Sequence, residues 1–492
     1  MNREDHEDLS LREVRPDQYS PGARTNRSRE PFLSLSHGHH RRLDKIVSTV
    51  SKCSPIILFA LLFVAGFRTY LLIQQTTGGG DLLYSDIPKS IMLLHGQDPY
   101  SANPWSAPYP PLLLFVVGGI IRITSGNLPL TPTTLGIVDQ NVRIAGLFAS
   151  SLVAIIIYAT LRLRGRTGFE ALIPASLFAT LPAVSTTPLL YWFHSDMFGY
   201  PILALSLLFL ASGRYFTGIS VLAVAAIFKI HPILALPPIL IWLGRRHGLK
   251  ETLPTLLITT TILALGLALP FELPGYAESV LGFNLANTGT GTNTFSIFNI
   301  VYGILPGLGL QFPTTITDQV WVGATAFLFT IVMAVVWRYG NRLDPLQIVL
   351  LGVTAWMIPL KMLFTAYLIW ALIPVLMQGR LRHAIVLAGL LQAADTMAYW
   401  SSFPVNSPVP WLGTVYGFFF TSLVYCTFSV LAMITALQMR NVRMRDDDIA
   451  IPAEQSSSTI YPIVARVSAT TANTNGNFSL EGLWNRAASQ NS

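Results

Sequence analysis

Long apolar runs follow one another along most of this chain, from residue 55 to residue 438. Each run is close to the roughly 20 residues that a helix needs to cross the hydrocarbon core of a bilayer. Of the 492 residues, 51% are hydrophobic and only 12% are charged, so a water-soluble protein of this size would lack polar surface. Backbone groups inside a bilayer must be hydrogen-bonded within the spanning segment, which a helix achieves. The sequence therefore predicts an all-α polytopic membrane protein.

Basic residues are concentrated in short clusters at the ends of these apolar runs. Positive residues in short loops mark the cytoplasmic side of a membrane protein. Membrane topology thus accounts for the net charge of +7, which gives no indication of a nucleic-acid partner. The two cysteines, Cys53 and Cys426, lie at or inside predicted spans and have neither a disulfide nor a metal-ligand pattern.

The alternation of apolar runs and basic clusters predicts about twelve spans with both termini in the cytoplasm. Residues 51–440 would form the transmembrane domain. The flanking segments 1–50 and 441–492 are polar and have no hydrophobic period, so we expect two disordered cytoplasmic tails.

Two large loops are predicted on the outer, non-cytoplasmic side, at 76–142 and 271–318. The first contains an apolar run at 109–123 that is short and begins near two prolines. If this run crossed the membrane, the cluster after residue 161 that contains Arg162 would fall outside, against the positive-inside rule. We therefore expect 109–123 to form a membrane-hugging helix within the first loop.

The same topology gathers ionisable residues on the outer side, whereas few lie deep inside a predicted span. The outer set comprises Asp81, Asp86, Asp98, His194, Asp196, Lys229, His231, Glu272 and Lys361. A transporter is expected to carry ionisable groups or broken helices near the midplane of the bilayer. One-sided placement favours an enzyme that acts at the outer surface on a substrate lying partly in lipid. A lipid-linked-sugar flippase or another secondary transporter is the alternative.

The outer residue types suit the transfer of a group from a phosphate. A carboxylate can act as general base towards an attacking hydroxyl, and a lysine can neutralise a phosphate leaving group. Lys229 and Lys361 lie at span ends, where a lysine can also simply extend its charge to the interface. Their position on the outer side, against the positive-inside trend, favours phosphate binding. His194 and Asp196 could equally form an ordinary loop pair.

The order of several short segments resembles the membrane-embedded GT-C glycosyltransferases. In particular, the chain looks like the PIG-M-like mannosyltransferases of GPI-anchor assembly and the related prokaryotic polyprenol-phosphate-mannose-dependent enzymes. The segments are Asp81-Leu82-Leu83-Tyr84 with Gly96-Gln97-Asp98-Pro99-Tyr100 and Tyr109-Pro110-Pro111-Leu112, then Phe193-His194-Ser195-Asp196, Phe228-Lys229-Ile230-His231-Pro232, and Lys361 to Trp370 with Pro374.

This resemblance implies a GT-C-like bundle that transfers a hexose, with mannose favoured, from a dolichyl- or polyprenyl-phosphate donor to a lipid-linked acceptor. It implies Asp81 as general base, with Asp86 as the second candidate. It places Lys229, His231, Lys361 and His194 at the donor phosphate. The residues implied to bind the substrate are Tyr84, Asp98, Tyr100, Trp105, Tyr109 and Asp196.

The sequence departs from the family pattern at two positions. The GPI-type Asp-x-Asp motif is not present in the first loop, because Asp81 and Asp86 are five residues apart, and Ala366 occupies a position that is often Gln or His. Either aspartate could bind Mg²⁺ or Mn²⁺ together with a phosphate, and no other cofactor is predicted. The acceptor stays open, and an accessory subunit is compatible with the sequence.

Overall fold

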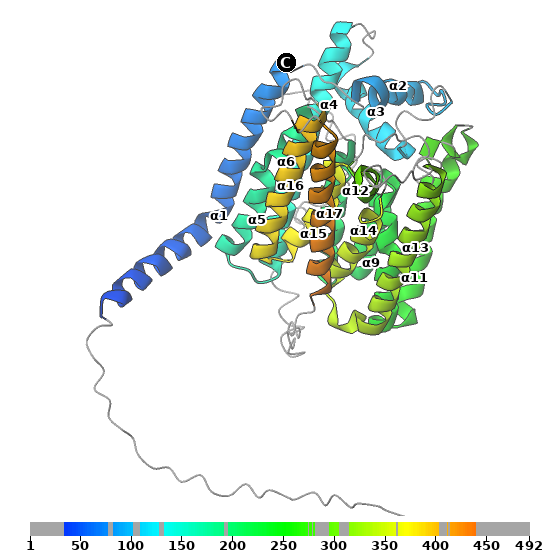
Figure 1. The fold of residues 1–492 in the computed structure, drawn as a ribbon. Coiled ribbons are helices and arrows are strands. Elements are labelled where there is room, and N and C mark those ends of the chain that lie inside the picture. The colour runs from blue at the N-terminus through cyan, green and yellow to red at the C-terminus, as the bar shows by residue number, and fades with distance from the viewer. Residues whose placement is uncertain are drawn as a thin grey trace, which may run out of the picture.

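The computed structural model describes residues 34–76, 82–101, 109–126, 132–190, 195–273, 275–277, 279–280, 295–304, 314–360, 363–402, 411 and 414–438. Within these ranges the secondary structure is helical apart from one isolated bridge between Phe295 and Leu363. Most helices lie side by side in one bundle, with α2 (Ile87–Leu94) and α3 (Pro111–Ser125) together at one end of it, at the top of Figure 1. An all-α membrane protein is therefore confirmed.

Five helices are long and apolar enough to cross a membrane. They lie in α1 (Ser34–Gln75), α4 (Pro132–Leu163), α11 (Leu249–Leu263) with its continuation to Ala268, α13 (Thr314–Tyr339) and α17 (Val415–Leu437). A sixth span is formed if α5 (Gly168–Thr180) and the short helices α6 (Pro182–Ser185) and α7 (Thr187–Leu190) count as one segment bent by 60°.

Five further helices of the bundle have only 12 to 14 residues each: α8 (Tyr200–Ala211), α9 (Tyr215–Phe228), α10 (Leu236–His247), α14 (Pro345–Met357) and α15 (Thr365–Met377). α16 (Leu381–Ser402) has 22 residues but is not among the helices apolar enough to count as a span. The expected count of twelve spans is thus not confirmed, although a helix occupies each predicted apolar segment. Prolines explain the short lengths, because they stand in the first turn of α8, α10 and α14, where a missing N–H costs nothing but the preceding helix must stop.

Three expected loops and tails contain more helix than the sequence suggested. α1 begins at Ser34, inside the segment 1–50 that was expected to be disordered. Extending an existing helix is far cheaper than nucleating one, so the apolar span carries the helix back into polar sequence. The first loop, 76–142, contains α2, α3 and the start of α4, and α3 is the expected helix at 109–123. The second loop, 271–318, contains α12 (Ile297–Ile304) and the start of α13.

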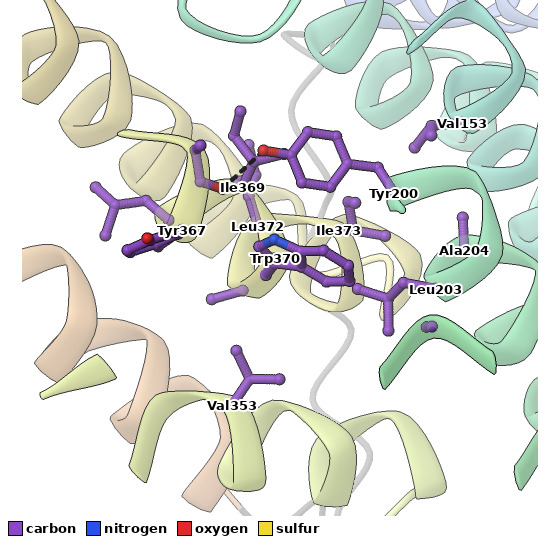
Figure 2. Close-up of a cluster of buried hydrophobic side chains, with 14 of the residues drawn as sticks. Val153, Tyr200, Leu203, Ala204, Val353, Tyr367, Ile369, Trp370, Leu372 and Ile373 are labelled. Carbon is purple, nitrogen blue, oxygen red and sulfur yellow. Dashed lines mark hydrogen bonds between the residues drawn. The ribbon is translucent and has the colours of Figure 1, made fainter. Parts of the chain in front are cut away.

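The interior of the bundle is built around α14 and α15. Every residue of α14 from Leu346 to Met357 is buried, and so is every residue of α15 from Ala366 to Met377. A helix that is apolar on all sides belongs in the centre of a structure. Figure 2 shows Trp370 and its neighbours in α15 packed between Tyr200 and Leu203 of α8 and Val353 of α14. Both helices thus lie in the centre of the bundle.

Candidate functional site

A buried ion pair joins two segments that the sequence placed on the outer side. Lys229 directly follows α9, and its Nζ donates a hydrogen bond of 3.0 Å to Oδ2 of Asp196 in the 3₁₀ helix η3 (Ser195–Phe198). The indole Nε1–H of Trp370 donates to Oδ1 of Asp196 at 3.0 Å. The side chains of Lys229 and Asp196 are only 6% and 0% exposed. Both carboxylate oxygens are therefore occupied, which is how a buried charge is tolerated.

Two tyrosine rings surround the ammonium group of Lys229. Nζ lies 4.0 Å from the ring centroid of Tyr109 and 5.3 Å from that of Tyr367. Aromatic faces attract cations, and the attraction is stronger when water is excluded. We refer to Lys229, Asp196, Trp370, Tyr109 and Tyr367 as the lysine box.

His231 lies beside the lysine box, stacked on another aromatic ring. Its imidazole centroid is 3.8 Å from that of Trp356 in α14, at an interplanar angle of 25°, and 4.6 Å from that of Tyr367. The residue is 4% exposed. Among the described residues, neither of its ring nitrogens has a hydrogen-bond partner. An unbonded buried nitrogen is unfavourable, so this position is suited to a ligand that supplies the missing bond.

Trp370 is held in place by close packing. Tyr200 lies edge-on to its ring at 5.3 Å and donates its hydroxyl to the carbonyl oxygen of Ala366 at 2.8 Å, the bond drawn in Figure 2. Gly199 also lies against this ring, where an added Cβ would come within 2.8 Å of Cη2 of Trp370. The position of the indole donor is therefore fixed relative to Asp196.

The first outer loop is connected to the lysine box through Tyr109. The hydroxyl of Tyr100 donates to the carbonyl oxygen of Tyr109 at 2.8 Å. Asp98 accepts from the N–H of Tyr100 at 2.9 Å and from the N–H of Gly275, in the second outer loop, at 3.4 Å. Tyr276 then packs edge-on against Tyr100 at 5.2 Å. Asp98 thus links the two outer loops and fixes the residues that support Tyr109.

A second acidic and basic cluster lies at the start of α2. Asp86 is fully buried at the residue before α2, and Lys89, three residues later, is 4% exposed and lies 5.6 Å from the ring centroid of Tyr100. Burial lowers the pKa of Lys89 to about 8, although the carboxylates of Asp86 and Asp98 act in the opposite direction. Burial also raises the pKa of Tyr276 to about 12 and that of Tyr100 further.

Another buried pair holds the start of the first loop. Arg143 and Asp139 of α4 form a salt bridge, and both side chains are almost fully buried. Arg143 also donates to the carbonyl oxygen of Thr76 at 3.0 Å and to its hydroxyl at 3.1 Å. The end of α1 is thereby tied to α4 at the residue where the first loop begins.

The structure brings together four of the residues singled out from sequence, namely Tyr109, Asp196, Lys229 and His231, and it connects Tyr100 and Asp98 to them. Asp86 lies with Lys89 in the neighbouring cluster. Of Tyr84 only the backbone is described, in the π-helical turn η2 (Leu82–Asp86). The other site residues lie outside the described residues: Asp81, Trp105, His194 and Lys361.

Sequence reasoning missed several residues that the structure adds. Tyr367 and Trp370 belong to a segment that was recognised but received no role of their own, and Trp356 was not considered. Asp395 of α16, inside a predicted span, is 4% exposed and hydrogen-bonds the side chains of Thr187 and Thr365. A single acid in an apolar run was the available signal, since such a residue is a candidate functional group.

Metal binding finds no support in the described part of the chain. Within it, no three His, Cys, Asp or Glu side chains lie close enough together to hold an ion. Asp81, one of the two aspartates considered for Mg²⁺ or Mn²⁺, lies outside that part.

Comparison with known proteins identifies no family for this chain. No protein-family model matches it, and a search of curated proteins finds no match either. The resemblance to GT-C enzymes therefore rests on the quoted segments.

Proposed function

We propose that this protein is a GT-C-type glycosyltransferase. It would transfer a hexose, with mannose favoured, from a dolichyl- or polyprenyl-phosphate donor to a lipid-linked glycan or glycolipid on the non-cytoplasmic face. One observation carries the proposal: segments far apart in sequence, each quoted for the resemblance, meet in the lysine box and at His231. The first loop contributes Tyr109, and the later segments contribute Asp196, Lys229 and Tyr367 with Trp370.

The lysine box suits the phosphate of a lipid donor. An ammonium group has three N–H donors, and Lys229 gives one of them to Asp196. The remaining donors are available to a phosphate oxygen, and such charge-assisted bonds are strong where water is excluded. Asp196 holds Lys229 in position through the 3.0 Å hydrogen bond. The unbonded nitrogens of His231 offer a further contact to the same phosphate.

The reaction needs one base and one stabilised leaving group. The acceptor hydroxyl oxygen attacks the anomeric carbon, and the bond between this carbon and the phosphate oxygen breaks as the new bond forms. A carboxylate takes the hydroxyl proton, and the polyprenyl phosphate leaves towards Lys229. Asp81 is the first candidate for the base and Asp86 the second. Asp196 is a poor base because both of its oxygens already accept hydrogen bonds.

The test is transfer of radiolabelled mannose from dolichyl-phosphate mannose to extracted lipids by the purified protein in detergent. We expect product from the wild type, none from Asp81→Asn and none from Lys229→Gln. Lys250→Gln removes an exposed lysine of α11 and serves as the matched control. Product formation by Lys229→Gln at the wild-type rate would refute the role of the lysine box.

The same assay separates the enzyme from the transporter alternative. A lipid-linked-sugar flippase would form no new glycosidic bond in detergent, where there is no bilayer to cross. Absence of product with mannose and other hexose donors, together with donor flipping in liposomes, would replace the glycosyltransferase with a flippase.

A further inference from the structure

A cavity lined by exposed basic residues opens between α1 and α4, away from the buried lysine box. It has a volume of about 450 Å³ and is lined by Ser51, Lys52, Pro55, Tyr158 and Arg162. Arg162 is near the end of α4, whereas Arg143 holds the start of the first loop. At 1.5 Å per residue, these two arginines are roughly 28 Å apart along the helix, close to the thickness of a hydrocarbon core. The cavity and the first loop therefore lie at opposite surfaces of the membrane domain.

Hydrogen bonds fix the wall of this cavity. Pro55 has no N–H to give to the carbonyl oxygen of Ser51, and the hydroxyl of Ser54 donates to that oxygen instead, at 2.7 Å. The Ser54 oxygen is also 2.7 Å from the hydroxyl of Tyr158. On the other side, the N–H of Gly168 donates to Oγ of Ser51 at 2.9 Å. The helices α1, α4 and α5 are thus joined around a preformed hollow.

The two cations at this cavity form no ion pair with any residue that the structure describes. Within the described part of the chain, neither Lys52 nor Arg162 has a carboxylate partner, and both are exposed. A lysine and an arginine beside hydroxyl groups can bind a phosphate through several charge-assisted hydrogen bonds.

Apolar side chains flank these charges. Ile56 and Phe59 of α1 are 73% and 71% exposed, and Leu163, next to Arg162, is 62% exposed. Phe59 lies one helical turn beyond Pro55, on the same face of α1. In a membrane-spanning helix such residues face acyl chains. The ligand that fits both parts is an amphiphile with an anionic head.

We propose that this cavity binds the phosphate headgroup of an anionic phospholipid, with its acyl chains along α1. Basic pockets between transmembrane helices are suited to such headgroups. By the positive-inside rule, the cavity faces the cytoplasmic leaflet. This site is separate from the lysine box and does not depend on the proposed transfer reaction.

The experiment is a lipid titration of the full-length protein in detergent, followed by native mass spectrometry. The ligands are dioleoyl phosphatidic acid, dioleoyl phosphatidylcholine and inorganic phosphate as competitor. The test variant is Lys52→Gln with Arg162→Gln, and the control is Lys45→Gln with Arg382→Gln, which removes two other exposed charges.

We expect the test variant to bind phosphatidic acid about tenfold or more weakly than wild type, because bonds to charged groups are lost. The control should bind it as wild type does. Phosphatidylcholine should bind more weakly than phosphatidic acid, and inorganic phosphate should not displace the lipid. Equal binding by wild type and test variant would refute the site, as would equal losses in both variants. Displacement by inorganic phosphate would show a free-phosphate site instead, and equal affinity for phosphatidylcholine would refute the anionic requirement.

Discussion

Lys229 lies almost fully buried between a carboxylate and two tyrosine rings, whereas Lys52 and Arg162 lie exposed at an open cavity. The first charge is compensated by the protein itself. Among the described residues the other two have no carboxylate partner. A charge far from water has to be paired within the protein. A charge at an interface is solvated, so it needs no such partner and can bind an anion from outside the protein. We therefore expect the loss of Lys229 to lower stability as well as the proposed activity, whereas the loss of Lys52 and Arg162 should have little effect on folding.

The largest effect is expected from breaking the buried pair. Lys229→Gln takes the cation away from the buried carboxylate of Asp196, so we expect a loss of about 3–5 kcal/mol in stability. Loss of a donor aimed at developing charge costs about 10²–10³ in rate, so mannose transfer should fall at least that far. Thermal melting in detergent and the transfer assay measure the two effects.

A double variant separates the two effects. Lys229→Gln with Asp196→Asn removes both charges while an amide oxygen can still accept from Trp370. We expect most of the stability to return and the activity to stay lost. A return of activity would show that Lys229 is a structural residue and that the donor phosphate binds elsewhere.

A second prediction concerns the packing around the cavity between α1 and α4. A Cβ on Gly168 would lie 2.2 Å from the carbonyl oxygen of Ser51 and 2.9 Å from Nη1 of Arg162, so Gly168→Ala has to push α5 away from α1. Overpacking of this kind costs about 1–3 kcal/mol. Gly119→Ala in α3 is the control, because nothing lies within 4 Å of its added Cβ. A melting temperature of Gly168→Ala equal to that of the control would contradict the close contact.

The sequence predicted the class of fold because apolar runs at membrane length leave few alternatives. It also placed Lys229 and Asp196 on one side of the membrane. It could not pair them, because they are 33 residues apart and Trp370 is 174 residues from Asp196. Only the packing of α8, α9 and α15 brings these segments together.

Two further features could not be predicted from the sequence, for physical reasons. Lys52 and Arg162 were interpreted as topology signals, because the positive-inside rule accounts for basic residues at the end of a span without any ligand. Sequence reasoning assigned no role to Lys89, because a lysine in a predicted loop is normally solvated. Its burial follows from contacts with Tyr100, which sequence spacing does not specify.

A third prediction tests the aromatic wall of the lysine box. Tyr109→Leu removes the ring 4.0 Å from Nζ of Lys229, whereas Tyr109→Phe keeps it. A cation–π contact contributes about 0.5–2 kcal/mol, which corresponds to roughly a 2- to 30-fold change in affinity. We expect KM for dolichyl-phosphate mannose to rise by a factor within that range in Tyr109→Leu, and by a smaller factor in Tyr109→Phe. Equal values for both variants would argue against a role for the ring.

A fourth prediction asks whether burial lowers the pKa of Lys89 despite two nearby carboxylates. The pH dependence of acetylation at Lys89, followed by mass spectrometry, should have its midpoint at about 8. An ordinary lysine has its midpoint near a pKa of about 10.4. Asp86→Asn removes a charge that favours the protonated amine, so the pKa of Lys89 should fall further. An unchanged or higher midpoint would mean that Asp86 does not act on Lys89.

The smallest change in stability is expected from removing the exposed charges of Lys52 and Arg162, in contrast to the large loss expected for Lys229→Gln. Lys52→Gln with Arg162→Gln keeps most of the aliphatic stems and breaks no ion pair that the described residues form, so stability without lipid should change by no more than about 0.5 kcal/mol. Added phosphatidic acid should raise the melting temperature of wild type and not that of the variant, because a ligand stabilises only a protein that binds it. A large loss of stability before lipid is added would mean that these cations hold the helices together, and the distinction between a compensated and an open basic site would fail.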